Sequence, residues 1–262
     1  MILPRWLRVV ALLGLALLVL PLLGMITRVN WQTLGQDLFS PAALTALWLS
    51  FATAACSTVV CLILGLPLAI VMARASGRLA AILRTLVLVP LVLPPMVGGL
   101  ALLSLLGRSG LIGKPLFEST GFSLPYTTAG VVVAQAFVAL PFLVISLEGS
   151  LRTSGEGHER VAASLGAGRW RVLTQVTIPL ILPGLVAGTV LAFARALGEF
   201  GATALFAGNA AGVTRTMPLA IYTAFNGVGV SQDSALALSL LLLVSAAVVV
   251  GGLRSWREDA VR

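Results

Sequence analysis

The sequence predicts an all-α polytopic membrane protein with six transmembrane helices, and three observations lead to that fold class. Of the 262 residues 58% are hydrophobic, only 10% are charged, and the mean hydropathy is +1.05. A soluble domain carries roughly 25% charged residues, so this chain lacks the charges that a water-facing surface needs. Its apolar residues gather in stretches of about 20 or more, the length that a bilayer-spanning helix requires.

The first apolar run covers residues 7–26 and follows Arg5 and Arg8. A secretory signal peptide has a shorter apolar core, typically ~7–15 residues, and ends in an A-x-A cleavage site. This run is longer and no such site precedes Arg28. We therefore expect an uncleaved first span, with a cleaved signal peptide as the alternative.

Five further apolar runs follow, each long enough to cross a hydrocarbon core of about 30 Å as a helix. They occupy residues 43–73, 79–106, 128–147, 179–206 and 234–253. The connections between them leave no room for a separate soluble domain. Residues 1–262 are therefore expected to form a single transmembrane domain.

The basic residues predict the orientation of these spans. Twelve arginines fall in the N-terminal segment, the turn at 74–84, the loop at 148–176 and the C-terminal tail, against four basic residues in the opposite connections. This bias predicts that both termini and the 148–176 loop are cytoplasmic, in a bacterial-type inner membrane. The net charge of +8 then reflects topology, and no nucleic-acid partner is expected.

The sequence predicts no catalytic, nucleotide or metal site, and hence no cofactor in this chain. The nearest approach to a phosphate loop, at residues 110–115, has Pro115 where magnesium binding needs Ser or Thr. His158 is the single histidine, so the zinc motif H-E-x-x-H cannot form. A membrane enzyme is disfavoured because few polar groups converge within the spans.

Arg195 and Glu199 are the two charges that lie well inside a predicted span. Four residues apart, they are expected to share one helix face. Charges within a span are costly and usually face the bundle interior or a water-filled cavity. Two interpretations stay open: an element of the transport pathway or gate, and a structural ion pair that fixes helix packing.

Prolines and glycines interrupt the run at 79–106, where Pro94 and Pro95 are followed by Gly98. Proline removes a backbone donor and clashes with the preceding turn, while glycine permits bending and close approach. In lipid such breaks are tolerated only where neighbours or a cavity satisfy the freed carbonyls. Pro94, Pro95 and Gly98 are therefore candidate gate residues, with ordinary helix kinks as the alternative.

The predicted cytoplasmic loop contains a short helix at residues 159–165, which Gly166 is expected to terminate with a positive φ. The small side chains of Ala162 and Ala163 leave a face that a partner can cover. Pro179 is placed in the first turn of the next span. An amphipathic helix entering a partner's groove is a common mode of recognition, and an interfacial loop is the alternative.

This loop resembles the EAA motif of permease subunits of binding-protein-dependent ABC importers. The family pattern is E-A-A, three residues, a glycine, nine residues, and then I-x-L-P. Here Gly166 is followed by nine residues and by Val-Thr-Ile-Pro179, while the triplet falls on Arg-Val-Ala162 with an acid one position earlier. The coupling residues that the resemblance implies are Glu159, Arg160, Ala162, Ala163, Gly166 and Pro179.

Residues 195–203, 206–209 and 214–222 are similar to the molybdate permease subfamily. The resemblance implies a type I importer permease that works as a homodimer with cytoplasmic ABC ATPase subunits and an external oxyanion-binding protein. It also implies alternating access, driven by ATP hydrolysis in the ATPase and transmitted through the short cytoplasmic helix. The alternatives are a sulfate/thiosulfate permease of the same family and an ion-coupled secondary transporter, which needs coupling carboxylates at the membrane midplane.

Overall fold

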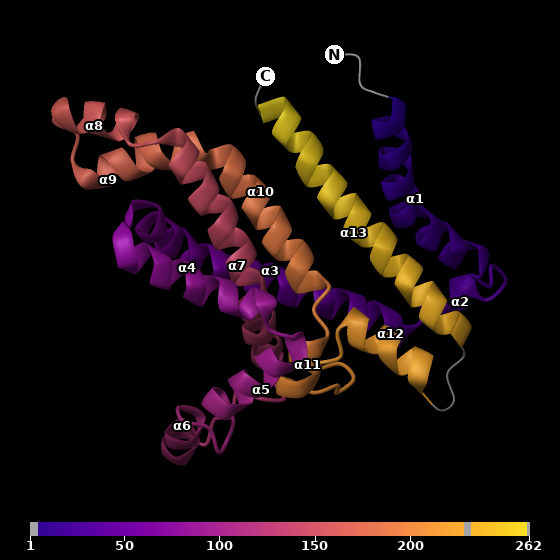
Figure 1. Cartoon of the computed structure of the whole chain (residues 1–262). Coiled ribbons are helices and arrows are strands. Elements are labelled where there is room, and N and C mark those ends of the chain that lie inside the picture. The colour runs from indigo at the N-terminus through magenta and orange to yellow at the C-terminus, as the bar shows by residue number, and fades with distance from the viewer. Residues whose placement is uncertain (1–4, 228–231, 261–262) are drawn as a thin grey trace.

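The computed structural model describes residues 5–227 and 232–260, and in these residues every regular element is a helix, as the sequence predicts. The first half of the chain (Figure 1) contains α1 (Arg5–Thr27), α2 (Leu34–Leu38), α3 (Pro41–Arg74), α4 (Gly77–Val92), α5 (Pro95–Leu106) and α6 (Gly113–Thr120). The second half contains α7 (Thr128–Ser154), α8 (Gly157–Ser164), α9 (Arg169–Val172), the π-helical turn η1 (Leu173–Thr177), α10 (Ile178–Leu197), α11 (Gly201–Phe206), α12 (Met217–Asn226) and α13 (Gln232–Ala260).

The centre of the molecule is formed by α3, α7 and α10. Small residues allow these helices to approach closely: Gly65 of α3 and Gly188 of α10 both lie against Leu143 of α7. The Ser57 hydroxyl of α3 also lies 2.9 Å from the Val132 carbonyl of α7. Small residues at contacts and hydrogen bonds between helices are the usual means of packing in lipid, where apolar burial drives no association.

Two smaller clusters flank this centre. The start of α3 packs against α12 and α13 through Ala46, Met217 and Leu238. On the other side, α5 and α11 pack against α7 through a cluster that includes Ala202 and Phe206. Helix α7 therefore contacts both the central helices and the pair of short helices α5 and α11.

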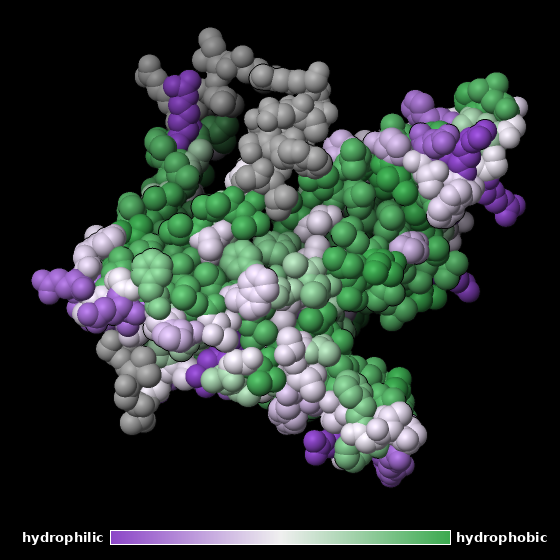
Figure 2. Space-filling model, turned by 180° about the vertical axis from the view of Figure 1, so that it is seen from behind, coloured by the Kyte–Doolittle hydropathy of each residue, from purple (hydrophilic) through white to green (hydrophobic). Residues whose placement is uncertain are grey.

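A broad apolar surface covers the middle of the molecule. Figure 2 shows hydrophobic residues over most of one face, with hydrophilic residues gathered at its extremities. By length and composition, four helices are able to cross a membrane: residues 6–27, 41–74, 128–154 and 169–197. α4 with α5 gives a fifth span if the bent pair is counted as one, and the predicted total of six stays a prediction.

The run at 79–106, predicted as one span, is instead two helices bent by 113° at their junction. Leu93 and Pro94 both adopt extended backbone conformations, with ψ near 135°. Each precedes a proline, whose ring disfavours the helical conformation in the residue before it. The predicted break at Pro94 and Pro95 is therefore confirmed, and it divides the run at 79–106 into two helices.

The predicted loop at 148–176 is shorter than expected. Helix α7 continues past residue 147 to Ser154, where Gly155 with a φ of +64° ends it. On the other side, α9 and η1 run on into α10, so that residues 169–197 form one helix of 29 residues. Polar side chains mark the membrane edge in the sequence, but they do not stop a helix, so the helices extend into the predicted loop.

The run at 179–206 is interrupted as well. Helix α10 ends at Leu197, and α11 begins at Gly201 after a short break. Two segments that the sequence predicts as single spans are therefore broken. One breaks at prolines, and the other breaks at residues that include glycine and Glu199.

The start of α1 and the end of α13 lie at the same end of the molecule as α8 and α9 (Figure 1). This arrangement agrees with the prediction that these segments share one side of the membrane, and which side that is stays a prediction. Helix α1 stands apart from the bundle in the figure, and no part of its apolar stretch is buried.

Candidate coupling segment and gate

The coupling segment consists of α8 and the turn that follows it. The helix forms where the sequence predicts one, and none of its residues is buried. Gly166 adopts a φ of +87°, as predicted, and its N–H donates to the Ala163 carbonyl at 3.0 Å. A Cβ atom at this position would meet nothing within 4 Å, so glycine is required for the backbone conformation and not for space.

The predicted Ala162 and Ala163 differ in exposure. Ala163 is exposed and lines the cavity beside α3, and Ala162 is half-buried. The large apolar side chains offered to a partner are Val161 and Leu165, with 61% and 82% of their surfaces exposed. Sequence reasoning missed them, although their spacing of four residues places them on one helix face beside the predicted Arg160.

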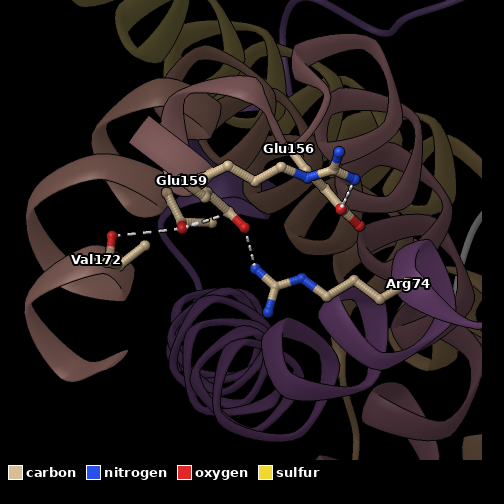
Figure 3. A network of polar contacts seen from close by, with 6 residues as sticks. Arg74, Glu156, Glu159 and Val172 are labelled. Carbon is tan, nitrogen blue, oxygen red and sulfur yellow. Dashed lines mark hydrogen bonds and ion pairs between the residues drawn. The ribbon is translucent and has the colours of Figure 1, made fainter. Parts of the chain in front are cut away.

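The inward face is tied to the membrane helices by Glu159 (Figure 3), which lies between Arg74 and Val172. Its Oε2 atom is 2.7 Å from Nη2 of Arg74, at the C-terminal end of α3. Its Oε1 atom accepts a hydrogen bond of 2.6 Å from the Thr177 hydroxyl in η1. One carboxylate thus joins α8 to two other elements.

A second ion pair joins α8 to the residue before its first turn, and the positive charge of Arg74 also acts on that residue, Glu156. Nη2 of Arg160 lies 2.7 Å from Oε2 of Glu156, four residues earlier. The hydrogen bond and the positive charge of Arg160 lower the pKa of the Glu156 carboxyl below its ordinary value. Both side chains are largely exposed, so the pair carries little stability.

Pro179 lies in the first turn of α10, as predicted. The helix does not begin there, because α9 and the π-helical turn η1 precede it without a break. A π-helical turn inserts one residue more per turn than an α-helix and is frequent at functional sites. In this chain it carries Thr177, the hydroxyl that contacts Glu159.

Arg195 and Glu199 form the predicted ion pair, with 2.7 Å between Nη1 and Oε2. The predicted geometry is wrong in one respect: α10 ends at Leu197, so Glu199 does not share a helix face with Arg195. Its carboxylate lies in the break and its Oε1 atom accepts the N–H of Ala202 at 2.7 Å. Glu199 therefore links the end of α10 to the start of α11, where the helix dipole favours a negative charge.

The two breaks pack against each other. A Cβ atom added to Gly201, at the start of α11, would lie 2.9 Å from the Cβ of Pro95. One added to Gly99 of α5 would lie 2.9 Å from the Ala202 carbonyl oxygen. Gly98, a predicted gate residue, instead faces Phe137 of α7. The predicted Pro94, Pro95 and Gly98 thus belong to the same structural unit as Glu199.

A charged cluster that the sequence analysis did not single out connects α4 with α7. Glu148 is buried, and its Oε1 atom lies 2.7 Å from Nε of Arg84 and 3.5 Å from Nη1 of Arg152. The spacing of Glu148 and Arg152 is visible in the sequence, but the contact with Arg84 joins residues that are 64 positions apart. The cluster fixes α4 beside the C-terminal part of α7.

Among the described residues, no group of three or more histidine, cysteine, aspartate or glutamate side chains is arranged to hold a metal ion. The candidate functional features are the coupling segment, on one side, and the bent helices with their buried ion pair, on the other. Such an arrangement suits a membrane transport subunit that is moved by a partner.

The fold and these two features define the class of protein. Residues 65–256 match the family model described as "Binding-protein-dependent transport system inner membrane component". The chain belongs to this family, and it is a multi-pass inner membrane protein.

Individual relatives extend this result. The chain is 55% identical over 250 residues to the "Molybdenum transport system permease protein ModB" of Mycobacterium tuberculosis, covering 95% of this chain and 93% of the relative. It is 41% identical over 192 residues to the protein of the same name from Haemophilus influenzae, covering 73% of this chain and 84% of the relative. Both relatives are transport permeases by name.

Solved structures agree with the fold. A bacterial alginate ABC transporter in complex with its pentasaccharide-bound periplasmic protein matches with a TM-score of 0.73, over 95% of this chain and 92% of that chain. The inward-facing MetNI methionine ABC transporter matches with a TM-score of 0.65, over 84% and 96%. Both are 16% identical to this chain, so they support an ABC importer permease fold and nothing finer.

Proposed function

We propose that this chain is the membrane-spanning permease subunit of an ATP-driven importer for molybdate. The observation that carries the proposal is the 55% identity, over 95% of the chain, to permeases named for molybdenum transport. We assign the substrate from this similarity. The chain's own charges favour anions only weakly and do not identify the substrate by themselves. The chain is a transport subunit, and ATP is hydrolysed by a separate partner.

The partner ATPase binds the outward face of the coupling segment. Val161 and Leu165 are exposed apolar side chains on a short helix at one end of the molecule, beside the charged Arg160. Isolated apolar residues on a surface are ordinary, but in this family the segment corresponds to the motif that contacts the ATPase. Entry of a short helix into a groove buries such side chains.

The transport path runs beside the unit formed by α5, α11 and the Arg195–Glu199 pair. Glu199 is buried, whereas the Arg195 side chain keeps 26% of its surface exposed although it lies within a span. Broken helices in a membrane are tolerated where they line a cavity or are covered by protein. Two copies of the chain, with N- and C-termini in the cytoplasm, enclose the path and receive the oxyanion from an external binding protein.

Transport by the reconstituted complex tests the proposal. The chain is purified with the ATPase and binding protein of the same transport system, and inserted into liposomes with ATP inside or absent. We expect ATP-dependent uptake of ⁹⁹Mo-molybdate, with tungstate as competitor and without competition by sulfate. Uptake of sulfate in preference to molybdate would assign the sulfate/thiosulfate alternative, and uptake driven by an ion gradient without ATP would overturn the importer class.

A further inference from the structure

The outward face of helix α8 is the one that we assign to the ATPase. Its inward face points to the other helices of the chain and has no assigned function. None of its residues is buried, so packing alone does not fix the helix to the rest of the chain. Cavities of about 230 and 650 Å³ lie beside it, and Arg74, Glu156, Glu159 and Thr177 line both. Of these, Glu159 bonds to both Arg74 and Thr177, and 17% of its side-chain surface is exposed.

The carboxylate of Glu159 makes one strong contact to each of two elements. The Arg74 guanidinium at 2.7 Å belongs to the last turn of α3. The Thr177 hydroxyl at 2.6 Å is buried and belongs to the turn that leads into α10. Hydrogen bonds to an ionised carboxylate are short and roughly twice as strong as neutral ones, which suits them to hold a helix that packing leaves loose.

The two elements that Glu159 contacts lead to the centre and to the gate. Helix α3 packs along α7 in the core, and α10, which follows Thr177 directly and contains Arg195, has 20 residues and is about 30 Å long. The pair Arg195–Glu199 then joins α10 to α11, which packs against α5 at the bend. A continuous series of rigid helices and short charged contacts therefore connects α8 with the bent helices.

We propose that Glu159 is a positioning residue that transmits the movement of α8 to α3 and α10, and that it does not bind the ATPase. The proposal rests on the proposed function, since it assumes that the ATPase moves α8. Loss of the carboxylate lets α8 follow the ATPase while α3 and α10 stay behind. ATP is then hydrolysed without transport.

The variants separate the two contacts. Glu159→Ala removes both, Glu159→Gln removes the charge at Arg74 but keeps an acceptor for Thr177, and Thr177→Val removes only the hydroxyl. Glu156→Gln is the control, because Glu156, the residue before α8, forms an ion pair of the same 2.7 Å length with Arg160 of that helix, and Arg74 acts on it only through its charge. Assembly is measured first, as co-purification of the ATPase with each variant.

The ratio of oxyanion taken up to ATP hydrolysed is then measured in proteoliposomes. We expect Glu159→Ala to assemble normally and to lower this ratio at least fivefold, Glu159→Gln and Thr177→Val to lower it less, and Glu156→Gln to match the wild type. Loss of ATPase binding in Glu159→Ala and Glu159→Gln would make Glu159 a partner contact, and an unchanged ratio would make it dispensable; either result overturns the proposal.

A second measurement does not depend on the substrate. Spin labels at His158 on α8 and Ser76 beyond α3, both exposed, report the distance between these elements in the assembled complex after replacement of Cys56 and Cys61. We expect a narrow distance distribution that ATP leaves unchanged in the wild type and that broadens in Glu159→Ala. Identical distributions would overturn the proposal even if the wild type carries an oxyanion other than molybdate.

Discussion

The coupling segment and the gate unit are held together by opposite means. In α8 no residue is buried, and the contacts to other elements are charged side chains beside cavities. Around α5 and α11, glycines bring backbones into direct contact and Glu199 is almost completely buried. The segment that we propose follows the ATPase is thus tied by a few strong contacts, whereas the unit of α5, α11 and the Arg195–Glu199 pair, which we propose lies beside the path, is packed tightly. Substitutions should therefore affect coupling in the first region and stability in the second.

The largest effect is expected at the buried ion pair of the gate unit. Replacing Arg195 or Glu199 by glutamine leaves a poorly compensated charge, which typically costs about 3–5 kcal/mol. The double change removes both charges and should cost less than the sum of the two single changes. Thermal unfolding of the purified variants, with transport as a second readout, measures this coupling. Normal stability and transport in both single variants would contradict a gating role and a structural role alike.

A smaller loss is expected where the two bends meet. In Gly99→Ala the new methyl group would lie 2.9 Å from the Ala202 carbonyl oxygen and from the Leu205 Cβ, so α5 or α11 must shift. Such overpacking costs about 1–3 kcal/mol. Gly149→Ala in α7 is the control, since a Cβ there meets nothing within 4 Å. If both variants unfold at the same temperature and transport equally, the close approach of the two bends contributes neither to stability nor to transport.

In the coupling segment, a substitution at Gly166 tests the effect of backbone conformation alone. Gly166→Val forces a β-branched residue into a φ of +87°, at a cost of about 1–2 kcal/mol. Gly168→Val is the matched control, because Gly168 has a φ of −67° and equally open surroundings. We expect Gly166→Val to insert in the membrane but to lose ATPase co-purification, and Gly168→Val to retain it. Loss of ATPase co-purification in both variants would indicate that the added side-chain bulk, and not the backbone conformation of Gly166, causes the loss.

The smallest effect is expected at Glu156. Because Arg160 lowers the pKa of this carboxyl, the pair stabilises the folded state above the ordinary pKa of 4.5, and the contribution is lost as pH falls through the lowered value. The difference in unfolding temperature between wild type and Glu156→Gln should be small at neutral pH, begin to fall near pH 4.5 and disappear once the pH is below the lowered pKa. A difference that grows on acidification would contradict this assignment.

Much of the fold could be predicted because the bilayer makes the sequence pattern explicit. Apolar runs gave the long helices, and Pro94, Pro95 and Gly166 marked a bend and a turn at the residues where they occur. These features depend on local chemistry: a ring that removes a donor, or a residue without a Cβ. The Arg195–Glu199 contact was also predictable from spacing, although the break that separates the two residues was not.

The sequence by itself determined the fold class, the family, the bend in the third run and the turn after α8, because each follows from hydropathy or from one residue's backbone preferences. Only the tertiary structure decided which side chains meet. Glu159 with Arg74 and Thr177, Glu148 with Arg84, and Gly201 with Pro95 all join residues from different helices. Such contacts depend on how the helices are bent and packed, and no local pattern in the chain encodes them.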